Sequence, residues 1–135
     1  MAGKIFLYHA VKDIDKSKEF FKSLGHSFNE QFCDKSSACL ALSENIDVML
    51  LTEEKIKEIM PPDVVDTVKT AKMVTSISLD SKELVNGIVE KAKKAGAPVV
   101  RDPEDHGFML HRSFNDIDGH VWNYMWMDSA AMVNN

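Results

Sequence analysis

Residues 11–25 read VKDIDKSKEFFKSLG, and residues 79–96 repeat the design as LDSKELVNGIVEKAKKAG. Each segment begins at the end of a strand-like apolar run, has an acidic residue near its start (Asp13 and Asp80) and closes on a glycine. This pattern is typical of a helix with an acidic first turn and a glycine stop. In the second segment Asp80 and Glu83 have capping-box spacing, so we expect the helix to begin there. Its expected apolar face consists of Leu84, Val85, Ile88, Val89, Ala92 and Ala95.

Three further strand-like runs follow each helix. They lie at residues 27–33, 38–43 and 46–52 in the first half, and at 98–101, 108–114 and 120–127 in the second. Pro61 and Pro62 end a short helix and begin a linker over residues 61–72. The chain therefore predicts an α+β domain of two βαβββ modules, about residues 4–60 and 73–128. We expect a curved mixed sheet with helices on its convex side and a concave face for a ligand.

Composition excludes several classes of function. The chain of 135 residues has 16 basic and 21 acidic residues and no basic run, so it shows no nucleic-acid footprint. Its apolar runs are shorter than the roughly 20 residues of a membrane span, and its start lacks the pattern of a signal peptide. We expect a cytoplasmic protein without a membrane partner. Cys33 and Cys39 are expected to be thiols in a reducing compartment.

Two motifs, with the duplicated order, resemble the vicinal oxygen chelate superfamily of glyoxalases, extradiol dioxygenases and fosfomycin and bleomycin resistance proteins. Residues 11–25 are similar to the family's Asp-x-x-x-Ser-x-x-Phe-Tyr pattern, with Phe21 at the tyrosine position. Residues 114–122, FNDIDGHVW, are similar to its Asp-Pro-Asp-Gly turn, with Ile117 at the proline position. The resemblance covers about residues 4–128 and implies the glyoxalase/bleomycin resistance-like fold. It also implies a homodimer, which the sequence neither requires nor excludes.

In metal-using members of that family, four side chains, typically His, Gln or Glu, hold one divalent cation that polarises substrate oxygens. Carried over one at a time, these positions fall on Phe6, on Met49 or Leu50, on Val74 and on Asn123. None of these residues is His, Glu, Gln or Asp, and Asn123 offers only a neutral carbonyl oxygen. We therefore expect no metal and no other cofactor.

Alternation along the last strand separates Trp122, Tyr124 and Trp126 from Asn123 and Met125. The aromatic set suits the core, so the other set is expected to face the cavity. The resulting lining is apolar with a few hydrogen-bonding groups, as in pockets for organic molecules. The expected ligand-binding residues are Phe6, Tyr8, Met49, Val74, Ser76, Asn123 and Met125. A filled core without ligand remains an alternative, because methionine packs irregular gaps.

Two further residues are candidates for chemistry. His106, in the turn-rich segment 102–107, is a candidate general acid or base; the alternative is a loop histidine bonded to Glu104 or Asp105. Arg112 is a candidate cation for an anionic ligand group, and the alternative is a surface salt bridge. His111 and His120 lie within predicted hairpin strands, and neither has a partner at metal-ligand spacing.

These observations leave three functional hypotheses. The leading one is a metal-independent family member that sequesters or carries a small, partly apolar molecule. The second is a metal-dependent lactoylglutathione lyase-like or dioxygenase-like enzyme with a displaced metal site that uses His9, His106 or Asn123. The third is metal-free acid–base catalysis by His106. No motif identifies the ligand.

Overall fold

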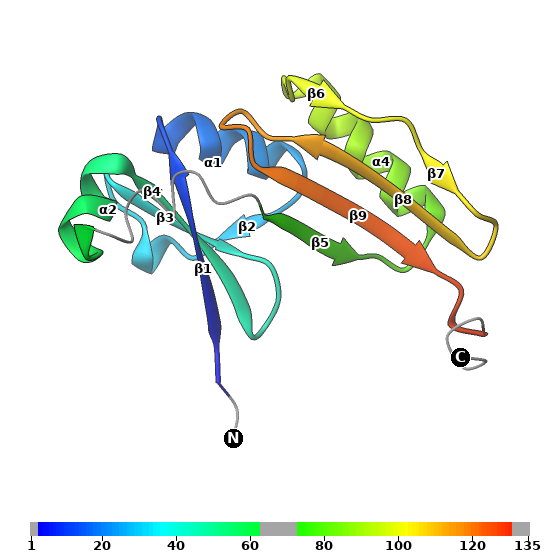
Figure 1. Ribbon diagram of the computed structural model, residues 1–135, viewed down its shortest axis with the longest axis horizontal. Coiled ribbons are helices and arrows are strands. Elements are labelled where there is room, and N and C mark those ends of the chain that lie inside the picture. The colour runs from blue at the N-terminus through cyan, green and yellow to red at the C-terminus, as the bar shows by residue number, and fades with distance from the viewer. Residues whose placement is uncertain (1–2, 63–72, 131–135) are drawn as a thin grey trace. The chain divides into compact units, whose positions relative to one another are not determined.

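The computed structural model describes residues 3–62 and 73–130, which belong to two compact units, Met1–Lys72 and Met73–Asn135 (Figure 1). Each unit contains one mixed sheet and at least one α-helix, so the α+β class and the duplicated element order are confirmed. Most of the expected linker, residues 63–72, lies outside the described residues. No helix in the described part of the chain is long and apolar enough to cross a membrane.

Unit 1 is a four-stranded sheet in the order β1-β4-β3-β2, with β1 and β4 parallel and the other pairs antiparallel. Its elements are β1 (Ile5–Val11), α1 (Ile14–Ser23), β2 (Ser27–Phe28), the 3-10 turn η1 (Glu30–Phe32), β3 (Ser37–Ala41), β4 (Ile46–Thr52) and α2 (Glu53–Ile59). The expected strand over residues 27–33 is wrong beyond Phe28. Asn29 ends the strand because its side chain accepts from the Gln31 amide (3.2 Å) and starts η1 instead.

Helix α1 forms as its sequence predicts. Asp13 caps it by accepting from the Lys16 amide (3.0 Å), and Gly25 follows its end at φ +97°, a conformation that glycine adopts without strain. Its apolar side, Phe20 and Phe21, continues into Leu24, and all three side chains are buried. These contacts fix α1 against the sheet of unit 1.

Unit 2 has the strand order β5-β9-β8-β6, and a short strand β7 also pairs with β8. Its elements are β5 (Val74–Ser78), α4 (Lys82–Lys94), β6 (Val99–Val100), β7 (Glu104–Asp105), β8 (Met109–Asn115) and β9 (Val121–Met127). In Figure 1, α4 runs along the far side of β8 and β9, which it contacts. Strand β7 was not expected, because sequence analysis treated residues 102–107 as a loop.

Helix α4 begins one residue later than the capping-box spacing indicated. The cap is Ser81, whose Oγ accepts from the Leu84 amide (3.1 Å), and not Asp80. The buried stripe is Val85, Val89 and Ala92, which recur every three or four residues as helical geometry requires. Leu84 lies about 100° away from Val85 around the helix and is 52 % exposed, so its assignment to the apolar face was wrong.

Strand alternation divides the unit 2 sheet into two faces. Trp122 and Tyr124 are fully buried on the side of α4, where Tyr124 stacks on Phe114 with ring centroids 5.7 Å apart. Asn123 and Met125 therefore point to the opposite side, here called the open face of unit 2. The predicted aromatic core is confirmed for Trp122 and Tyr124, whereas Trp126 is only partly buried, with Lys82 Nζ 5.5 Å from its ring centroid.

Candidate functional site

The open face of unit 2 carries a hydrogen-bonded polar pair with one apolar side chain beside it on each strand, and Ser113 of β8 lies opposite Asn123. Ser76 and Asn123 are partners in the parallel β5–β9 register, and Asn123 Nδ2 donates to Ser76 Oγ (2.7 Å). Val74 precedes Ser76 by two residues on the same face and is 59 % exposed, and Met125 follows Asn123 by two. Four predicted ligand-binding residues therefore share one face of one sheet.

The three remaining apolar candidates lie together in unit 1. Phe6 and Tyr8 are 48 % and 37 % exposed on the side of β1 away from buried His9. Met49 is the direct register partner of Tyr8 on β4 and packs against the cluster formed by Leu51 and Ile56. We call this side of the sheet the open face of unit 1. Its end near α2 is covered, because Ile56 belongs to that helix.

Asp47 is a buried carboxylate on this face that sequence reasoning missed. It is the register partner of Phe6, and its Oδ2 lies 2.9 Å from Lys4 Nζ and 3.1 Å from Cys39 Sγ. Burial, together with this hydrogen bond, raises the pKa of the Cys39 thiol to about 12. Asp47 thus pairs with an ammonium group and a protonated thiol. The available signal was an acidic residue within the apolar run 46–52.

Arg112 lies on the opposite side of unit 2 from Asn123. It is only 8 % exposed and faces α4, where its Nη1 lies 3.3 Å from Glu90 Oε1 and 3.4 Å from Asn86 Oδ1. Alternation along β8 explains the position, since the neighbouring His111 points to the other face. The structure therefore does not bring Arg112 together with the residues of the open face.

His106 lies beside Glu104, a neighbour that the loop alternative named, and beside His111, with which the sequence did not group it. Strand β7 pairs Glu104 directly with His111 of β8, and Glu104 Oε2 lies 2.9 Å from His111 Nε2. The imidazole rings of His106 and His111 have centroids 6.2 Å apart. One ligand atom from each of the three residues lies within 4.8 Å of the others. In the described residues of unit 2, these are the side chains that combine imidazole and carboxylate donors closely enough for one ion.

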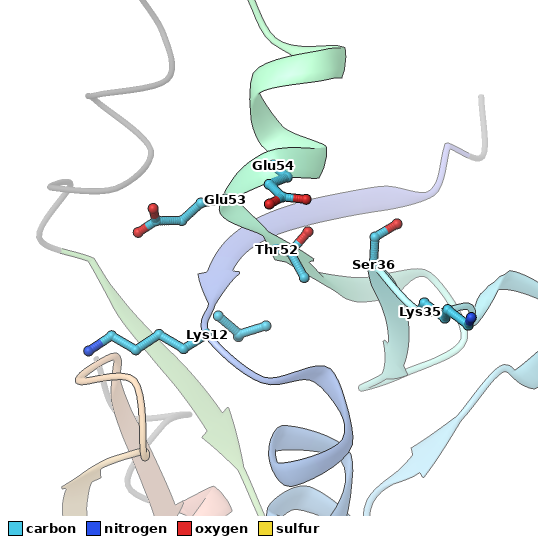
Figure 2. Close-up of a pocket in the computed structure, with 7 residues that line it drawn as sticks. Lys12, Lys35, Ser36, Thr52, Glu53 and Glu54 are labelled. Carbon is cyan, nitrogen blue, oxygen red and sulfur yellow. The ribbon is translucent and has the colours of Figure 1, made fainter.

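A shallow hollow of about 590 Å³ opens in unit 1, where β1 and β4 end (Figure 2). Its lining consists of Val11, Lys12, Lys35, Ser36, Thr52, Glu53 and Glu54. Figure 2 shows the side chains of Lys12 and Lys35 extending in opposite directions. The hollow is therefore polar and of mixed charge.

Structural roles explain much of the polarity around this hollow. Thr52 caps α2 by accepting from the Lys55 amide (3.2 Å), and its own amide donates to the Ser36 carbonyl (3.0 Å). The adjoining Asp34 accepts from the Ser36 amide (2.8 Å), which lowers the pKa of its carboxyl group. Caps and turns gather here, so we place the candidate site on the open faces instead.

Comparisons with known proteins agree with the duplicated architecture. The model of the Glyoxalase/Bleomycin resistance protein/Dioxygenase superfamily matches residues 7–124. Similar solved structures include a hypothetical protein from S. aureus (22 % identity, 93 % of this chain and 95 % of that chain, TM-score 0.74). A glyoxalase/bleomycin resistance protein/dioxygenase family enzyme from Burkholderia phytofirmans has 17 % identity, coverage of 90 % and 96 %, and a TM-score of 0.76.

The fosfomycin resistance protein FosX from Mesorhizobium loti is similar at 13 % identity, with coverage of 98 % and 96 % and a TM-score of 0.64. At these identities the structural matches show the fold alone. No curated protein sequence matches the chain.

Proposed function

The chain belongs to the glyoxalase/bleomycin resistance protein/dioxygenase superfamily, and from this premise we propose that it binds a small, partly apolar organic molecule without the family's metal. The observation that carries the proposal is the open face of unit 2. There the Asn123–Ser76 hydrogen bond lies among exposed Val74 and partly buried Met125. Pockets for organic molecules combine a mostly apolar surface with a few orienting polar groups.

The chemistry of the side chains supports this ligand class. Exposed apolar side chains release water when they are covered, at roughly 25 cal/mol per Å² of apolar surface. The Asn123 amide donates one N–H to Ser76, and a carboxamide has further donor and acceptor capacity for a ligand. Phe6 and Tyr8 on the open face of unit 1 offer aromatic surface of the same kind.

The family's metal positions, carried over by resemblance, support binding without a metal at those positions. Phe6, Val74 and either Met49 or Leu50 have no oxygen or nitrogen donor in their side chains. Asn123 has one neutral oxygen and already donates its amide to Ser76. We propose sequestration or carriage of the ligand as the activity, since neither role requires a Lewis acid.

The test uses the fluorescent naphthalene sulfonate ANS, a partly apolar anion, as the probe for the full-length protein. Wild type should bind ANS saturably. Val74→Asp and Met125→Asp should each weaken binding by about tenfold, because an apolar probe must then desolvate a carboxylate. Leu84→Asp is the matched control, since Leu84 is exposed on α4 and away from the open face.

Thermal unfolding of each variant accompanies the titration, because loosely packed states also bind ANS. Equal affinity for ANS in Met125→Asp and Leu84→Asp, with both proteins folded, would contradict the proposal. A mass-spectrometric survey of molecules that copurify with the wild-type chain then identifies the natural ligand class. A large, fully polar copurifying molecule would also contradict it.

A second candidate function is metal-dependent lyase or dioxygenase chemistry at a displaced site. One observation favours it, namely the approach of His106 to Glu104 and His111. Elemental analysis of the purified protein, before and after treatment with a chelator, tests this candidate. Metal below stoichiometric amounts, with any activity unchanged by the chelator, would exclude it.

A further inference from the structure

The strand pairing at the edge of unit 2 assembles three potential metal ligands. The β7–β8 register places Glu104 opposite His111, so their side chains emerge on the same face. His106 follows β7 at the turn, where its backbone N–H donates to the Met109 carbonyl (2.8 Å). The closeness of the three side chains is thus fixed by a short hairpin. It does not depend on the placement of unit 1.

The spacing of the ligand atoms suits a single ion. Ligand atoms that bind one Zn²⁺ at about 2.0–2.2 Å lie roughly 3–3.5 Å from one another. The Glu104 Oε2 to His111 Nε2 distance of 2.9 Å is already close to that separation. All three ligand atoms lie within 4.8 Å of one another, so modest side-chain rotations bring them onto one ion.

The neighbouring carboxylate is held elsewhere. Asp105 accepts from Lys82 Nζ at 3.0 and 3.1 Å and from the Gly107 amide at 2.8 Å. Gly107 has φ +82°, in the left-handed region that favours glycine, so the turn keeps this shape without strain. Glu104 is therefore the carboxylate that remains beside the two imidazoles.

The donor set defines the class of ion. Two imidazoles and one carboxylate suit Zn²⁺, Ni²⁺, Co²⁺ or Fe²⁺, whereas Mg²⁺ and Ca²⁺ prefer sites made of oxygen alone. Three protein ligands also leave at least one coordination position for water or another molecule. Glu104 and His106 are exposed and His111 is partly exposed, so an ion and its water can reach the site.

We propose that Glu104, His106 and His111 bind one divalent transition-metal ion of the Zn²⁺ class at the β7–β8 edge. None of the three occupies a position that the family resemblance assigns to a metal ligand. His111 is the register partner of Met125, so the ion borders the open face of unit 2. The proposal requires neither turnover nor binding of an organic molecule.

The experiment titrates full-length protein, stripped of metal with EDTA, with Zn²⁺ by calorimetry and separately with Mg²⁺. Wild type should bind one Zn²⁺ per chain and bind Mg²⁺ far more weakly. Glu104→Gln, His106→Asn and His111→Asn should each weaken Zn²⁺ binding by more than about tenfold. His120→Asn is the control, a histidine of the same unit outside the cluster, and should keep wild-type affinity.

A spectroscopic titration with Co²⁺ separates ligation from general stabilisation, because bound Co²⁺ gives visible absorption that depends on its ligands. These bands should appear in wild type and in His120→Asn, and be lost in His106→Asn and His111→Asn. Folded wild type that binds no Zn²⁺, or equal Zn²⁺ affinity in all variants, would overturn the proposal. ANS titration of the metal-free protein tests the proposed function separately. Binding of ANS without binding of Zn²⁺ would contradict the metal site and leave the proposed function intact.

Discussion

Asp116 organises the turn that leads into the last strand of unit 2. Its Oδ1 accepts from the backbone amides of Asp118 (2.9 Å) and His120 (3.0 Å), and its Oδ2 accepts from Trp122 Nε1 (2.9 Å). Burial raises the pKa of this carboxyl group although these hydrogen bonds oppose the shift. The folded state therefore holds the proton more tightly than the unfolded state. The stability from that difference is present at low pH and is lost as pH rises through the folded pKa.

The two cysteines should differ sharply in reactivity. Cys39 is fully buried and its thiol has a pKa of about 12, so only about one in ten thousand of these thiols is ionised at pH 8. Cys33 is only partly buried. We expect iodoacetamide at pH 8 to modify Cys33 in the folded protein and to reach Cys39 only after denaturation. Peptide mass spectrometry measures the extent at each site.

Raising the pH toward 12 should increase the reactivity of Cys39, because the thiolate is the attacking species. Cys33→Ser provides the control and should remove the fast reaction. Equal rates of modification at both cysteines of the folded wild type would refute the assignment of Cys39 as a protonated, shielded thiol.

The alternation of side chains along a strand predicted which face each side chain occupies, but it did not predict which residues that side chain contacts. Trp122 is buried and Asn123 lies on the other face, as the period of two requires. The same rule places Arg112 against α4, yet its neighbours Glu90 and Asn86 belong to a helix whose contacts the sequence does not reveal. The partners of Asp47 are likewise not apparent from the sequence, because Lys4 precedes β1 and Cys39 belongs to β3.

At the scale of elements, the start of α4 is set by one hydroxyl group. Ser81→Ala should lower the free energy of unfolding by about 1 kcal/mol, because the Leu84 amide loses its acceptor. Asp80→Ala should have a smaller effect, since Asp80 is exposed and acts only through the helix dipole. Urea denaturation followed by circular dichroism measures both. A larger loss of unfolding free energy in Asp80→Ala than in Ser81→Ala would show that Asp80 is the cap, as the capping-box spacing indicated.

Longer elements could be predicted because their periodicity repeats. Strand β4 occupies Ile46–Thr52, the same seven residues that the sequence predicted, and α1 is bounded by its acidic cap and glycine stop. Strand β7 has only Glu104 and Asp105, too few residues for any period. Its existence depends on pairing with β8, so the Glu104–His106–His111 cluster could not be read from linear spacing.

At the scale of the whole molecule, the fold could be predicted from the sequence because its pattern of elements is duplicated. Two copies of the strand–helix–strand pattern give two independent readings of one architecture, and an error in one element leaves the other copy intact. The wrong strand assignment at residues 29–33, for example, did not alter the predicted class. The duplication does not help to predict the function in the same way. The chemistry of each open face depends on single residues, and these differ between the two halves.

The ends of the two sheets bear on the assembly of the protein. Among the described strands, β1 and β5 each lie at the end of their own sheet. An edge strand presents backbone groups that can pair with another strand, and apolar side chains there favour association. Ile5 on β1 is 54 % exposed and Val74 on β5 is 59 % exposed. We therefore propose the homodimer that the family resemblance implies.

Light scattering coupled to size exclusion should report a particle of about twice the 15.2 kDa of one chain. Ile5→Lys should shift the particle toward one chain, because a charged lysine on an edge strand opposes strand pairing. Leu84→Lys, an equally exposed position on α4, should leave the mass unchanged. A single-chain mass for wild type throughout a dilution series would contradict the dimer. Equal masses for the two lysine variants would instead remove β1 from the interface, since Ile5 lies at the sheet end and Leu84 does not.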